Sequence, residues 1–136
     1  MSYEVYYLDS EFIIKNENFG ACMRAIEEYH KSLVPDIQCP GGALAYPEKV
    51  LEKKIAYALT YFGWPPEINE DGVWNIYYKH DRRGNIGLLR AIAKYVEAGS
   101  VIEYIGEDGK ACKIEFKNNS IKEFEGQIIY QEKSNE

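Results

Sequence analysis

The chain has 136 residues and a formal net charge of −6, and hydrophobic residues make up 46% of it. This length fits one domain, predicted over residues 1–130, followed by a flexible polar tail over residues 131–136. The acidic balance argues against a general nucleic-acid binder, which needs a basic surface, and no apolar run is long enough to span a membrane. The N-terminus lacks the basic and apolar regions of a signal peptide, so we expect a cytoplasmic protein.

The first half of the chain predicts one strand and two helices. Residues 3–8 are aromatic and β-branched, which favours a strand. Apolar residues at helical spacing then run from Phe19 to Leu33, with Asn16 or Asn18 as the cap. Residues 34–47 contain three prolines and a Gly-Gly pair, which predicts a long loop. A second helix is expected after this loop, ending at Gly63.

The second half predicts a third helix, over residues 85–97, and four strands. The strands are expected at residues 73–80, 100–106, 111–117 and 121–130. The last three form a β-meander, because Asp108-Gly109 and Asn118-Asn119 are tight-turn dipeptides. Within the meander, alternation places Cys112, Ile114 and Phe116 toward the core and the residues between them toward solvent.

These elements follow the order β-α-α-β-α-β-β-β. Short links between successive strands require antiparallel pairing. The sequence therefore predicts an α+β fold, in which three helices cover one face of an antiparallel sheet of about five strands as a two-layer sandwich.

Catalytic candidates are few. Cys39 lies in a Gly-rich loop, where an exposed thiol could act as a nucleophile, and His80 precedes Asp81 at a predicted strand end, where the imidazole could act as a base. No nucleophile motif accompanies either, so an incidental thiol and a plain loop residue are the simpler interpretations. The three cysteines are widely spaced, with Cys22 and Cys112 on apolar faces, which predicts buried thiols, a reducing compartment and no metal or other cofactor.

Carboxylates are frequent in the predicted meander, and they are the candidate partner-binding residues. They are Glu103, Glu107, Asp108, Glu115, Glu123 and Glu125. If Glu103, Glu115 and Glu123 or Glu125 share the solvent face, they form an acidic patch suited to a basic protein surface. Lysines alternate with these acids, so cross-strand ion pairing is the alternative interpretation.

The chain also holds 12 tyrosines, more than a domain of this size buries completely. Some are therefore expected at the surface, where tyrosine is favoured in interfaces. The interface could join two copies of the chain or bind a different protein, and the sequence leaves both open.

The C-terminal half of the chain also resembles a group of known sequences. This resemblance is carried by short pieces at helix, strand and turn positions: Ala91-Ile92-Ala93, Tyr95-Val96, Gly99-Ser100, Ile102-Glu103, Gly106-Glu107-Asp108-Gly109, Phe116 and Glu123. Over about residues 68–130 the chain resembles a group of small uncharacterised proteins of bacteria and their phages. It departs from their pattern at Cys112, where a tryptophan is expected, and at Asn118-Asn119, where Asp-Gly or Asn-Gly is expected. The resemblance implies the same C-terminal meander and no particular activity.

Together these features predict a non-enzymatic protein-binding or inhibitor module that acts through an acidic, Tyr-rich surface. The phage connection suggests an inhibitor of host defence of the anti-CRISPR type, if the gene is phage-borne, and a toxin-immunity protein is favoured if the gene lies beside a toxin gene. The alternative is a small enzyme or ligand-binding domain that uses Cys39, His80 and Asp81.

Overall fold

The computed structural model describes residues 5–8, 10–37, 48–68, 74–76, 84–106, 108–127 and 131–133. Its elements are β1 (Val5–Tyr7), a 3-10 turn (Asn16–Asn18), α1 (Phe19–Leu33), α2 (Glu48–Tyr61), β2 (Pro66–Ile68), β3 (Trp74–Ile76), α3 (Ile86–Ile92), a second 3-10 turn (Ala93–Tyr95), β4 (Val101–Gly106), β5 (Lys110–Lys117) and β6 (Ser120–Gln127). The α+β class and the three helices are confirmed.

The strands form two antiparallel sheets in the described part of the chain. One has four strands in the order β1-β4-β5-β6, and the other pairs β2 with β3. The prediction of a single sheet of about five strands is therefore wrong. The predicted strand at 73–80 does not join the main sheet, because its described part, β3, pairs with Pro66–Ile68, a segment that was not predicted to be a strand.

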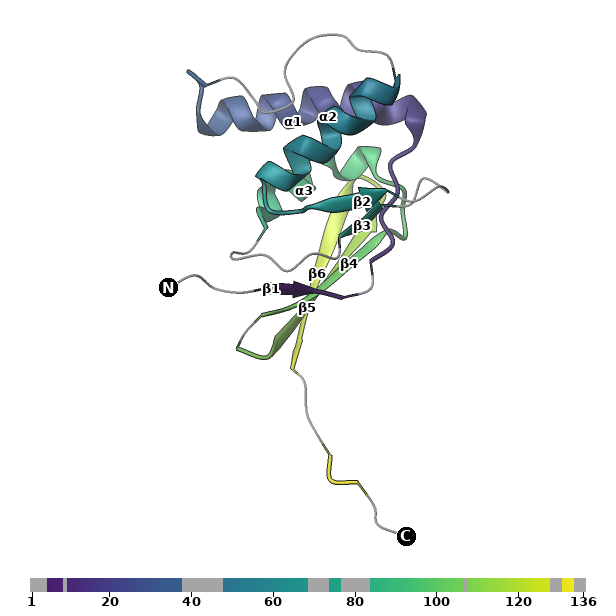
Figure 1. The fold of residues 1–136 in the computed structure, drawn as a ribbon, viewed down its shortest axis with the longest axis vertical. Helices are drawn as coiled ribbons and strands as arrows, with labels where there is room; N and C mark the ends of the chain where they lie inside the picture. The colour runs from purple at the N-terminus through teal and green to yellow at the C-terminus, as the bar shows by residue number, and fades with distance from the viewer. Residues whose placement is uncertain are drawn as a thin grey trace.

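Helices α1 and α2 lie side by side at one end of the molecule, and the strands of the main sheet run away from them (Figure 1). The periodicity predicted for α1 is confirmed, since Phe19, Cys22, Met23 and Ile26 are buried. His30 is buried too, and its ring packs against Tyr61 and Phe62.

The core joins the helices to one face of the main sheet. Ile102, Ile114 and Phe116 of the sheet belong to the same buried cluster as residues of all three helices. We call this side of the sheet the helix face, and the side that carries Glu103, Lys113 and Glu115 the open face. The inward alternation predicted for Ile114 and Phe116 is confirmed.

Two cysteines of the described residues differ in burial. Cys22 is fully buried, and burial raises the pKa of its thiol to about 12. Cys112 is only partly buried, so the expectation of a buried thiol there is wrong. The reason is its position near the turn of the β4–β5 hairpin, between Tyr104 and Glu125, where it borders a pocket.

The turns of the meander form as predicted. Gly109 and Asn119 both have positive φ, of 82° and 68°. Asp108 also accepts a hydrogen bond from the backbone N–H of Lys110 at 3.0 Å, which closes the first turn. Beyond the meander, residues 131–133 are exposed and lie away from the sheet (Figure 1).

Candidate functional site

The register of the meander decides how its acidic residues are distributed. Ile114 pairs with Glu123 and Cys112 pairs with Glu125, so both glutamates of β6 lie on the helix face. Glu103 pairs with Lys113, and Glu115 pairs with Lys122, on the open face. The predicted shared face is therefore wrong, because two acids project from each side of the sheet.

Each of three glutamates in the meander has a basic neighbour. On the open face, Lys117 donates a hydrogen bond to Glu115, and this bond lowers the pKa of the carboxyl group. On the helix face, Arg90 of α3 donates to Glu123 at 2.9 Å, and the Lys110 ammonium lies 3.8 Å from a carboxylate oxygen of Glu125. All three pairs are solvent-accessible, so each contributes little to stability.

Five rows of paired residues run across β4, β5 and β6, and successive rows alternate between the two faces of the sheet. On the open face, Phe124 continues the row of Glu103 and Lys113, and Gly126 continues the row of Tyr6, Ile105 and Ala111. Tyr6, Leu8 and Phe124 each keep 42% of their surface exposed. The ammonium groups of Lys113 and Lys122 lie 5.9 and 5.5 Å from the centre of the Phe124 ring. The open face thus combines exposed apolar groups with charges of both signs.

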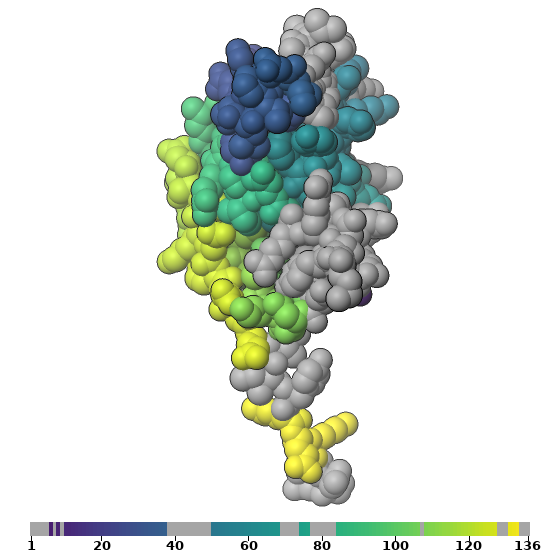
Figure 2. All heavy atoms as spheres, turned by 90° about the vertical axis from the view of Figure 1, so that its left-hand side faces the viewer, coloured from purple at the N-terminus to yellow at the C-terminus, as the bar shows by residue number. Residues whose placement is uncertain are grey.

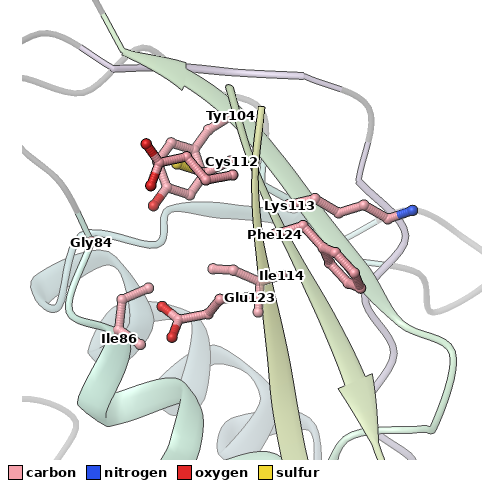
Figure 3. Close-up of a pocket in the computed structure, with 9 residues that line it drawn as sticks. Gly84, Ile86, Tyr104, Cys112, Lys113, Ile114, Glu123 and Phe124 are labelled. Carbon is pink, nitrogen blue, oxygen red and sulfur yellow. The ribbon is translucent and has the colours of Figure 1, made fainter. Parts of the chain in front are cut away.

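The helix face of β6 borders a pocket of about 310 Å³. Its side chains come from three strands and from the start of α3: Tyr104, Cys112, Ile114, Glu123, Glu125 and Ile86. In Figure 3, the Glu123 carboxylate points toward Ile86, whereas Lys113 and Phe124 point to the opposite side of the sheet. The pocket therefore has an apolar floor and an acidic rim, a combination that suits a ligand with an alkyl stem and a positive charge.

The wall of the pocket at α3 is held firmly in place by Asn85. The Asn85 side-chain oxygen accepts from the Leu88 N–H at 3.1 Å, as the helix cap, and from the Tyr29 hydroxyl at 2.8 Å. The Asn85 backbone carbonyl accepts from the Trp64 indole at 2.9 Å. No motif or periodicity in the sequence marks Asn85 or the pocket.

β6 is the outermost strand of the main sheet, and its surface is uncovered along one flank (Figure 2). Every residue from Lys122 to Gln127 is exposed. Within the described chain, β6 pairs with β5 alone. Its outer backbone groups are therefore available to another strand.

No protein-family model, curated protein or solved structure matches this chain. The site must therefore be interpreted from its own geometry. Over the residues that the structure describes, no group of His, Cys, Asp and Glu side chains could hold a metal ion, and no helix is long and apolar enough to cross a membrane.

Four of the predicted site residues lie outside the described part of the chain. They are Cys39, His80 and Asp81, the catalytic candidates, and Glu107, a partner-binding candidate. The other five partner-binding candidates are all on the meander, but only Glu123 and Glu125 border the pocket. A count outward from the Asn118-Asn119 turn would have placed these two glutamates on one face and Glu115 on the other.

Proposed function

We propose that the protein is a non-enzymatic binding module that recognises another protein through β6 and the sheet surfaces beside it. The observation that carries the proposal is the exposure of β6: six successive residues, Lys122 to Gln127, are exposed, and Phe124 among them is aromatic. A long exposed strand at the end of a sheet offers backbone donors and acceptors with which a partner strand can pair.

The chemistry of this surface favours a protein as the partner. Phe124 offers an apolar anchor, and the lysines and glutamates around it offer charges of both signs for orientation. Aromatic anchors surrounded by polar residues are typical of protein interfaces. An inhibitor of a host defence complex, or an immunity protein, would act in this way by occupying a surface of its target.

The test is affinity capture with the tagged protein from cells of the organism that encodes it. Wild type is compared with Phe124→Ser, and the matched control is Tyr57→Ser, which removes an aromatic ring that is 65% exposed on α2. We expect wild type and the control to recover the same partner, and Phe124→Ser to recover roughly tenfold less of it. Thermal unfolding of all three proteins checks that each is folded.

Two results would contradict the proposal. If no variant and no wild-type sample recovers a partner, the protein is not a binding module. If Phe124→Ser recovers as much partner as the control, the interface lies elsewhere on the molecule.

A further inference from the structure

The outer edge of β6 has the length and exposure that strand addition requires. β6 has eight residues, all of them paired with β5 on its inner side. A strand that binds by edge addition forms main-chain hydrogen bonds along such an edge, while its side chains alternate between the two faces.

A second copy of this chain meets like charges in the registers centred on the middle of that edge, from Lys122 to Glu125. Antiparallel pairing of β6 with itself brings residues of the same face opposite each other. Centring the pair on Phe124 places Glu123 opposite the copy's Glu125, whereas centring it on Glu123 or on Glu125 places that glutamate opposite itself. Centring on Lys122 opposes two lysines. Directly opposed like charges destabilise a strand pair, so these central registers of self-pairing are disfavoured.

The same charges favour a strand with basic residues. On the helix face, a partner strand would place alternate side chains opposite Glu123 and Glu125. Neighbouring strands lie about 4.8 Å apart, so an extended lysine or arginine side chain crosses β6 and reaches the pocket. There its charged end would meet the two carboxylates, close to Ile86.

The existing partners of the two carboxylates leave room for another cation. Arg90 contacts one oxygen of Glu123, and Lys110 is 3.8 Å from one oxygen of Glu125. A carboxylate accepts about four hydrogen bonds, so both retain accepting capacity.

We propose that the binding partner adds an extended strand to the outer edge of β6, and that this strand carries lysine or arginine at alternate positions, directed at Glu123, Glu125 and the pocket. The residues of the partner strand that alternate with its basic residues would lie on the open face, beside Phe124 and Lys122. Apolar side chains fit best at those positions. The inference rests on the proposed function, since it specifies how the partner of that same surface binds.

The test uses a blocked peptide of eight residues that alternates lysine and valine, the length of β6. Binding is measured by calorimetry to wild type, to the double variant Glu123→Gln/Glu125→Gln, and to the control Glu103→Gln/Glu115→Gln, which removes the same charge from the open face. We expect the first double variant to weaken binding roughly tenfold or more and the control less than about threefold.

Two further measurements separate strand addition from charge attraction. A peptide with N-methyl groups on every second amide, placed on the side that faces β6, keeps its charge but cannot pair with the edge, and we expect it not to bind. In a Cys39→Ser background, the alternating peptide should slow alkylation of Cys112, which lines the pocket, roughly tenfold at saturation. Cys22 is buried and stays unreactive in the folded protein.

Failure of this inference is distinguishable from failure of the proposed function. No binding of the alternating peptide to wild type, equal loss in both double variants, or undiminished binding of the N-methylated peptide each overturns strand addition. If Phe124→Ser still abolishes partner capture in that case, the binding module stands and its partner binds through the open face instead.

Discussion

The pocket has two walls of opposite character. At α3, Gly84 packs against a fully buried tryptophan, and Asn85 is hydrogen-bonded to three other parts of the chain. At β6, the side chains are exposed and their ion pairs are weak. The difference shows that the two walls contribute unequally to stability, and that the proposed recognition surface is the weakly held wall. The wall at α3 holds the pocket in shape, and the wall at β6 can receive a partner without loss of the fold.

The largest effect is expected at Gly84. A Cβ atom there would lie 2.3 Å from Cε2 of Trp64, whose side chain is fully buried and cannot move aside. Gly84→Ala should therefore lower the free energy of unfolding by about 3 kcal/mol, as measured by urea denaturation. The matched control is Gly20→Ala in α1, where the nearest heavy atom is the flexible end of Arg24 at 3.8 Å.

For Gly20→Ala, the free energy of unfolding should stay the same or rise by up to about 1 kcal/mol, since alanine favours the helical conformation more than glycine does. If the two alanine variants have equal stability, the packing of Trp64 is not rigid, and the contrast between the walls is wrong.

A smaller effect is expected at Asn85. Asn85→Ala removes the α3 cap and leaves the Tyr29 hydroxyl without its acceptor, so we expect a loss of about 2 kcal/mol by urea denaturation. Asn85→Asp keeps an oxygen that accepts both bonds, and it places a negative charge at a helix N-terminus, so its loss should stay below about 1 kcal/mol. Equal losses in the two variants would mean that the backbone bonds of Asn85, which both retain, hold this wall alone.

The two walls also differ in how far the sequence predicts them. The Asn118-Asn119 turn fixes Lys117 opposite Ser120, and from that pair the register of β5 and β6 follows directly. The split of the acidic residues between two faces was therefore present in the sequence, and it was missed because the acids were grouped by composition rather than by register.

The α3 wall could not be predicted in the same way. The bonds of Asn85 reach Tyr29, Phe62 and Trp64, residues whose proximity depends on how the helices pack. The segment Pro66–Ile68 becomes a strand although proline and glutamate disfavour strands, because β3 is there to pair with it. Tertiary contacts decide both features, and no local pattern reports them.

The smallest effect on stability is expected from the double variant Glu123→Gln/Glu125→Gln. It removes two solvent-exposed ion pairs and keeps the size of both side chains, so the free energy of unfolding should fall by no more than about 1 kcal/mol. Because exposed pairs are screened by salt, that difference should shrink further in 1 M sodium chloride, where the screening length is about 3 Å. Urea denaturation at low and high salt measures both quantities. A loss above about 2 kcal/mol that salt does not reduce would mean that the glutamates of β6 are part of the structural framework. The pocket wall at β6 would then be as constrained as the wall at α3.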